Sequence, residues 1–153
     1  MLSVSLIARL CISNEERQAI LNICACIDAK LNDLDYEVTS IINAQNNIRD
    51  LRYTDETLND KCRRYFDADI KCKKREARKI VVQLRKLCVD LRKTIRRKQI
   101  PECKAVYAAT QLLDEKEAYI NGGSFQYATY RNAVNKFRKE YQRLEKYLKE
   151  GRR

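Results

Sequence analysis

Apolar side chains recur at alternating spacings of three and four along residues 14–52, which is the pattern of one face of an α-helix. Ser13 and Glu16 form an S-x-x-E capping box directly before the pattern begins. We therefore predict a first helix over about 14–52, close to 60 Å long at about 1.5 Å per residue. One position in this apolar series is polar: Gln45 either sets the register between packed helices or lies in solvent. The series is Ile20, Ile23 or Cys24, Ile27, Leu31, Leu34, Val38, Ile41, Gln45, Ile48 and Leu51.

A second helix is predicted from Asp55 to about residue 100, after a tight reversal at Tyr53-Thr54. Thr54, Asp55 and Glu56 supply an N-cap and an acidic first turn, which the helix dipole favours. Neither Gly nor Pro interrupts the chain before Pro101. The heptad phase shifts over 67–76, which allows a kink or a short break there. The apolar positions are Leu58, Cys62, Phe66, Ile70, Ala77, Ile80, Leu84, Leu87, Leu91 and Ile95.

Two shorter helices are predicted after Pro101, which suits the first turn of a helix better than its interior. The first covers about 101–120, with Ala105, Ala109, Leu112, Leu113 and Ile120 on one face. Asn121-Gly122-Gly123-Ser124 is a strong loop signal. The second covers about 125–150, and its heptad positions are Tyr127, Tyr130, Val134, Phe137, Tyr141, Leu144 and Leu148.

These patterns predict an all-α fold: an elongated antiparallel helical bundle with coiled-coil-like heptad packing. It has three long helical spans, and the third is broken at Asn121–Ser124. The helices are expected to run antiparallel because short connections force neighbouring helices to do so. Only three Gly and one Pro occur in 153 residues, which agrees with long helices. Residues 13–153 form a single domain. The apolar residues 1–12 form an arm or short helix packed on the bundle or on a second subunit; a membrane anchor or part of a mitochondrial signal is the alternative.

Positive charge is unevenly distributed along the chain and is concentrated in one segment. The chain has a net charge of +11. Residues 71–98 contain 13 basic and two acidic side chains and so equal that total by themselves, whereas residues 1–70 contain eight basic and 12 acidic ones. Such asymmetry indicates a polyanionic partner: nucleic acid, an anionic membrane surface or an acidic protein surface.

The basic segment contains a heptad repeat, RKIVVQL, RKLCVDL and RKTIRRK, starting at residues 78, 85 and 92. On a helix, its Leu and Ile positions face the core, and two ridges of cations flank a seam of two valines. We predict that these ridges and the seam bind a polyanion or a partner helix. The first ridge is Arg78, Arg85, Arg92 and Arg96, the second is Arg75, Lys79, Lys86, Lys93 and Arg97, and the seam is Val82 and Val89.

The first functional hypothesis is a non-enzymatic protein that binds the nucleic-acid backbone without sequence specificity, through phosphate contacts alone. The alternative is a scaffold or assembly protein whose helices pair with other chains, either as a homo-oligomer or with an acidic helix. The exposed valine seam favours this alternative, because it resembles half of a coiled-coil interface. Binding to an anionic membrane surface is a third, less favoured hypothesis, since the seam is too small to insert deeply.

Candidate chemistry elsewhere in the chain is sparse. There is no histidine, and no phosphate-binding Gly-rich loop, nucleophile elbow or paired-carboxylate motif is found, so we expect no enzyme, cofactor, metal or small-molecule substrate. The seven cysteines are irregularly spaced and are expected to be reduced and mostly buried. The aromatic residues of 125–150 are expected in the core rather than stacked on bases. With no secretory signal and no membrane-spanning run, an intracellular location, cytoplasmic or nuclear, is predicted.

Overall fold

The protein is almost entirely helical wherever its structure, a computed structural model, describes it. The described residues are 14–51, 55–98, 103–115 and 127–150. They contain no strand, and their helices are α2 (Asn14–Arg49), α3 (Glu56–Lys98), α4 (Lys104–Glu115) and α6 (Tyr127–Glu150). The all-α prediction is thus confirmed. The predicted arm at 1–12, the cap at Ser13 and the Asn121–Ser124 loop lie outside the described residues.

The helix limits differ slightly from those predicted. α2 ends at Arg49 rather than near residue 52, and α3 ends at Lys98 rather than near residue 100. The predicted N-cap Thr54 and the predicted reversal at Tyr53-Thr54 lie outside the described residues. Asp55, which the sequence placed in the acidic first turn, acts as a cap: its Oδ1 accepts hydrogen bonds from the backbone N–H groups of Thr57, at 2.9 Å, and Leu58, at 3.4 Å. The described parts of the two later helices are 104–115 and 127–150.

α3 continues without a break through 67–76, where the phase of its pattern allowed a kink. Ile70 and Ala77, one heptad apart, are both buried. Between them Lys73 and Lys74 are half-buried. They occupy the positions at which an apolar residue was missing from the pattern, and a lysine stem can cover such a position while its ammonium stays in water.

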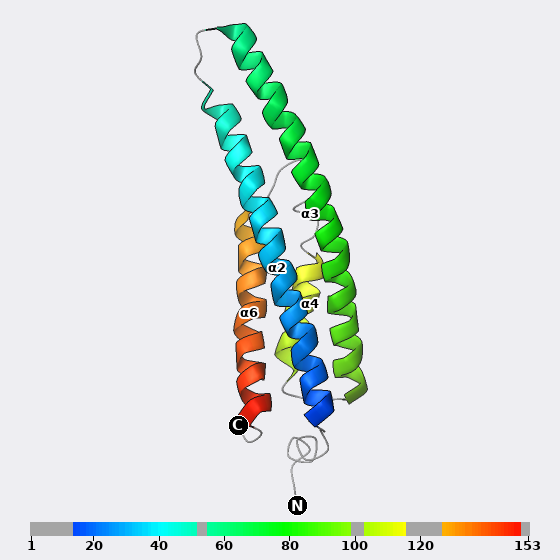
Figure 1. Ribbon diagram of the computed structural model, residues 1–153. Coiled ribbons are helices and arrows are strands. Elements are labelled where there is room, and N and C mark those ends of the chain that lie inside the picture. The colour runs from blue at the N-terminus through cyan, green and yellow to red at the C-terminus, as the bar shows by residue number, and fades with distance from the viewer. Residues whose placement is uncertain (1–13, 52–54, 99–102, 116–126, 151–153) are drawn as a thin grey trace, which may run out of the picture.

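The four helices pack as a bundle. Figure 1 shows α2 and α3 side by side and antiparallel along their length, with α4 and α6 on one half of the pair. The principal helix contacts are α2 with α3, α3 with α4, α4 with α6 and α6 with α2. Following these contacts closes a ring, so α3 and α6 lie at diagonally opposite corners. The other half of the α2–α3 hairpin extends beyond α4 and α6 (Figure 1).

The main core lies between all four helices, and its members on α3 are those that the sequence placed on the core-facing sector. α2 and α6 contribute stripes at the predicted spacing as well. The largest fully buried side chains include Ile20, Ile27, Leu31, Leu34 and Val38 of α2, Leu91 of α3, Val106 of α4, and Tyr130 and Phe137 of α6.

A second, smaller core joins the far halves of α2 and α3. It consists of Ile41, Ala44 and Ile70, with Ile48 and Phe66 packed against them. Ala44 is buried here while Gln45 is exposed, so the solvated alternative for Gln45 is the one observed. The seam moves by one residue because a straight helix of 3.6 residues per turn drifts from a strict seven-residue repeat.

Leu58 shows the effect of having only two helices at the far end. The sequence placed it on the apolar stripe of α3, but it is 42% exposed. That part of the prediction is wrong, because the described structure has only α2 and α3 at this end and two helices cannot enclose every side chain of a wide stripe.

We expect Leu31→Ala to lower the free energy of unfolding by about 2–5 kcal/mol, since it removes buried methyl groups and leaves a cavity in the main core. Leu58→Ala is the matched control, and because its side chain is largely exposed it should cost less than about 1 kcal/mol. Chemical denaturation measures both. Equal losses for the two variants would contradict the described core.

Candidate functional site

The outer face of α3 points away from the bundle. We define it as Arg75, Lys79, Val82, Lys86, Val89, Lys93 and Arg97, all of which are exposed. Val82 is 54% and Val89 37% exposed, which confirms the predicted exposure of the seam. The core-facing residues on the opposite side of the helix hold this orientation: Leu84, Cys88 and Leu91 are buried one turn apart.

A groove lies on this outer face. Its described lining consists of Val82, Arg85, Lys86, Val89, Asp90 and Lys93, all from α3. Its floor is therefore apolar, and three of the four charged residues that line it are cations. Such a lining suits an anionic group that also carries some apolar surface.

The cations of the outer face have few acidic neighbours. Lys79 pairs with Glu76 of the preceding turn at 3.1 Å, in a solvent-exposed contact. Among the residues that the structure describes, Arg75, Lys86, Lys93 and Arg97 make no ion pair within 4.0 Å. Exposed positive charges without internal partners are the groups that an external anion can neutralise.

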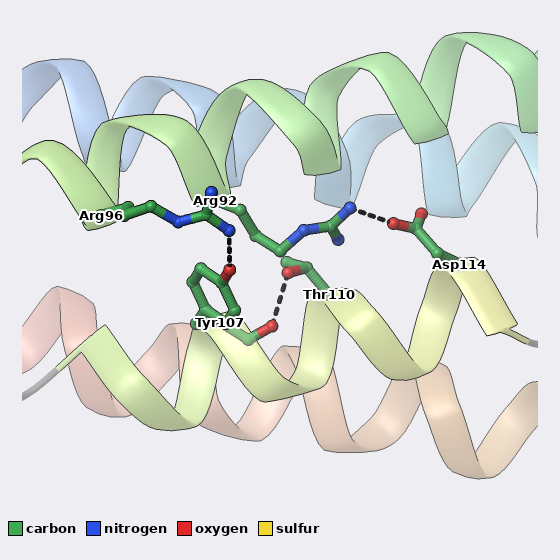
Figure 2. A network of polar contacts seen from close by, with 5 residues as sticks. All are labelled: Arg92, Arg96, Tyr107, Thr110 and Asp114. Atoms are coloured by element: carbon green, nitrogen blue, oxygen red, sulfur yellow. Dashed lines mark hydrogen bonds and ion pairs between the residues drawn. The ribbon is translucent and has the colours of Figure 1, made fainter.

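The first predicted ridge divides into two parts. Arg78 and Arg85 are exposed beside the outer face, and Arg85 lines the groove. Arg92 and Arg96 turn towards α4 instead (Figure 2). The Arg92 side chain is only 16% exposed and forms an ion pair with Asp114. The structure therefore does not bring Arg92 and Arg96 together with the outer face.

The contacts of Arg96 tie α3 to the start of α4. Its Nη2 donates a hydrogen bond to the Tyr107 hydroxyl, and its guanidinium carbon lies 5.8 Å from the centre of the Tyr107 ring. One turn further along α4, the fully buried Thr110 donates from its Oγ1 to the Tyr107 carbonyl oxygen at 2.7 Å (Figure 2). The Arg92–Asp114 pair and the Arg96–Tyr107 hydrogen bond fix α4 along α3.

α6 carries a second group of cations that the sequence analysis did not recognise as a surface. We define the outer face of α6 as Arg131, Lys136, Lys139, Arg143, Lys146 and Lys149, all exposed. On a helical wheel these six residues fall on one side, so the signal is present in the sequence. It is obscured because α6 has no short repeat and because two of its three acids, Glu140 and Glu145, alternate with the cations in sequence.

These two acids of α6 lie off its outer face. Glu140 is buried and accepts a contact from Arg143 at 3.4 Å, and Glu145, half-buried, pairs with Lys149 at 3.5 Å. Lys136, Lys139 and Lys146 make no ion pair within the described part of the chain. α6 thus presents a face of one charge sign to solvent.

The aromatic residues of α6 belong to the core, as predicted. Tyr130 and Phe137 are buried, and Phe137 lies with its ring centre 6.0 Å from that of Tyr141. Burial, followed by the charge of Glu145, raises the pKa of Tyr141 to about 12. These rings are therefore not presented to solvent for stacking against bases.

α6 is held against α2 by a polar contact at the edge of the core. Arg138 donates from Nε to Asp28 Oδ1 at 2.9 Å and from Nη2 to Asn32 Oδ1 at 2.6 Å. Both acceptors come from α2, and the pair is partly buried, so it orients α6 as well as neutralising one of its cations.

The cysteines behave as packing residues only in part. Burial raises the pKa of Cys24 and of Cys88 to about 12. Folding therefore favours the neutral thiols, and the stability that they contribute is lost as the pH rises from about 9 towards 12. Fewer cysteines are buried than predicted: Cys24, Cys88 and Cys103 are buried, Cys62 is half-buried, and Cys26 and Cys72 are exposed.

The residues that the structure describes contain neither a metal-binding cluster nor a membrane-spanning helix. They contain no group of three or more His, Cys, Asp or Glu side chains placed to hold a metal ion. None of their helices combines the length and apolar character needed to cross a bilayer.

Comparisons of the chain with protein-family models, curated proteins and solved structures found no match. Its function is therefore inferred from its own residues.

Thiol labelling checks the cysteine environments. At about pH 8 we expect a thiol reagent to modify Cys26 and Cys72 in the folded protein, because both side chains are exposed to solvent. Cys24 and Cys88 should react only after denaturation. Peptide mass spectrometry locates the modified residues, and rapid labelling of Cys88 in the folded protein would contradict its buried position.

Proposed function

We propose that this protein is a non-enzymatic helical bundle that binds the backbone of nucleic acid through the outer face of α3. One observation carries the proposal: Arg75, Lys86, Lys93 and Arg97 are exposed on one side of one helix and have no ion-pair partner in the described structure. The segment from 71 to 98 has a net charge of +11, so its field attracts a polyanion from well beyond contact distance.

The arrangement suits phosphate contacts rather than base recognition. Lys79, Lys86 and Lys93 are separated by one heptad each, about 10.5 Å along the helix. They form a row of flexible charges that can follow a phosphate backbone. The row contains no aromatic, Asn or Gln side chain, and such side chains or bidentate Arg contacts are what read base edges. Binding should therefore depend strongly on salt and weakly on sequence.

The charge of the outer face weakens the helix that carries it. Like charges four residues apart on a helix destabilise it by a few tenths of a kcal/mol per pair. Two such pairs, Arg75 with Lys79 and Lys93 with Arg97, lie on the outer face. Of these four cations, only Lys79 has an acidic partner in the described structure, Glu76. A bound anion would relieve the repulsion, so binding explains the cluster more readily than stability does.

We also propose the finer features of the fold. The buried positions 20, 24, 27, 31, 34, 38 and 41 of α2 alternate at four and three, which supports coiled-coil-like packing in an elongated antiparallel bundle. An intracellular site, cytoplasmic or nuclear, agrees with the reduced thiols of all six described cysteines.

One observation favours a second candidate function, a scaffold whose α3 pairs with an acidic amphipathic helix of another protein chain. Val82 and Val89 form an exposed apolar floor between cations, and nucleic acid has little use for such a floor. A helix with apolar residues at heptad spacing and acidic flanks would cover the valines and neutralise the cations together. An anionic membrane surface would neutralise the cations but would not cover the narrow seam of Val82 and Val89.

Charge reversal tests the proposed function. We expect Lys86→Glu/Lys93→Glu/Arg97→Glu to weaken binding to DNA or RNA at least about tenfold and to reduce the slope of log affinity against log salt by about 2.7, or about 0.9 per lost phosphate contact. A salt titration by fluorescence anisotropy measures both quantities. Arg92 and Arg96 are left unchanged, because they hold α4.

The matched control is Lys30→Glu/Lys61→Glu/Lys104→Glu, which makes the same change in net charge away from the outer face of α3. Its affinity should stay close to that of the unaltered protein. The proposal fails if the unaltered protein has no measurable affinity for nucleic acid at about 50 mM salt, where electrostatic binding is strong.

The valine seam separates the two candidate functions. Val82→Asn/Val89→Asn removes the apolar floor without changing any charge. Nucleic-acid affinity should remain unchanged, because phosphate contacts do not involve the valines. Loss of nucleic-acid binding in this variant would contradict binding through phosphate contacts alone, and binding of an acidic amphipathic peptide that disappears with the valines would favour the helix-pairing scaffold. The peptide is tested by isothermal titration.

A further inference from the structure

The bundle has two basic faces, and they point in opposite directions. α3 has 16 basic and six acidic residues, and α6 has seven and three. Each of these helices packs against both α2 and α4, and the pair α3–α6 is not among the principal helix contacts. Figure 1 accordingly shows α3 and α6 on opposite sides of α2. Their outer faces therefore point away from each other.

The surfaces that separate the two basic faces are not basic. α2 has three basic and six acidic residues, and α4 has one basic and two acidic. One anion that passed from α3 to α6 across α2 would cross a surface on which acids outnumber cations. The residues on the exposed side of α2 are mainly small or uncharged: Gln18, Asn22, Ala25, Ala29, Asn32, Asp33, Tyr36, Thr39 and Asn43.

The size of each face suits a nucleic-acid duplex. From Arg131 to Lys149 the outer face of α6 is about 27 Å long at about 1.5 Å per residue, and from Arg75 to Arg97 that of α3 is about 33 Å. Each length corresponds to about eight to ten base pairs at about 3.4 Å per base pair. Both faces lie on the half of the bundle where four helices pack (Figure 1), so they are opposite each other rather than displaced along the molecule.

Double-stranded nucleic acid fits these faces better than a single strand. Proteins that bind single strands stack bases on exposed aromatic rings. Tyr130, Phe137 and Tyr147 of α6 are buried and Tyr141 is half-buried, and Val82 and Val89 are the apolar residues of the α3 face. The faces thus offer charge without stacking surfaces.

A single stiff duplex cannot occupy both faces at once. Neighbouring helix axes in a bundle are about 8–10 Å apart. The charged ends of the side chains on the outer faces of α3 and α6, at diagonally opposite corners of the bundle, are therefore roughly 25 Å apart. The persistence length of DNA is about 150 base pairs, and a half-turn around so narrow a body would require far sharper bending than a duplex adopts without strong compensation.

We propose that the protein bridges two nucleic-acid duplexes, one on the outer face of α3 and one on the outer face of α6. This inference rests on the proposed function of α3 and adds a second site with its own residues. The protein would then hold two segments of duplex side by side, and a single copy suffices.

Energy transfer between two labelled duplexes tests the bridge. Two DNA duplexes of about 20 base pairs, about 68 Å long and so longer than either face, carry a donor and an acceptor dye. With the full chain we expect energy transfer at near-equimolar protein, its loss when protein is in large excess, and two duplexes per protein copy by sedimentation.

The variant Lys139→Glu/Lys146→Glu removes two of the cations on α6 that have no internal ion pair in the described structure. It should bind one duplex per copy through α3, with affinity within about threefold of the original, because the α3 contacts are untouched. Energy transfer should disappear. Lys30→Glu/Lys104→Glu makes the same charge change outside both faces and should still bridge. Lys139→Gln/Lys146→Gln replaces the first variant if circular dichroism shows it to be unfolded.

The outcomes distinguish the two proposals. Binding of one duplex by the unaltered protein, or energy transfer that persists in the α6 variant, would overturn the bridge and leave binding at α3 intact. The second of these results would mean that copies of the protein associate and bridge through α3 alone. Absence of any duplex binding would overturn the proposed function and the bridge together.

Discussion

The packing of the apolar side of α3 against α2 is the contact on which the rest of the structure depends. α3 is the longest of the described helices, and its isolated form would leave Leu84, Cys88 and Leu91 in water. Burying them against α2 fixes the rotation of α3 about its axis. That rotation in turn decides which of its cations point to solvent, because the two valines and the second ridge lie opposite the buried stripe. The candidate surface is thus a consequence of core packing.

Position along the bundle decides what the remaining cations of α3 do. Where α4 lies beside α3, Arg92 and Arg96 meet Asp114 and Tyr107 and serve the fold. Arg85 and Arg78, one and two heptads before Arg92 in the same ridge, stay exposed. A half-buried guanidinium needs a partner of this kind, since an unpaired charge is costly to remove from water. Equivalent positions in a sequence repeat therefore acquire different roles through their neighbours.

This contrast also shows how far the sequence alone predicts the structure. The helical pattern and the buried sector of α3 follow from local spacing, and both are observed. Three features depend on tertiary packing instead. The repeat could not show that Arg92 and Arg96 contact α4, nor could the apolar spacing show that Leu58 lies where only two helices pack. The cationic face of α6 was visible in the spacing, but its direction relative to α3 required the order of helices in the bundle.

That order also reduces repulsion between the two basic helices. At diagonal corners their axes are about 13 Å apart instead of about 8–10 Å, and a Debye length of about 8 Å at physiological ionic strength screens the outward-pointing charges further. α2, with its excess of acids, contacts both helices, and its Asp28 binds Arg138 of α6. Exchanging the places of α4 and α6 would bring the two basic helices into contact. The arrangement that lets α3 and α6 share one core is therefore the same one that turns their cationic faces in opposite directions.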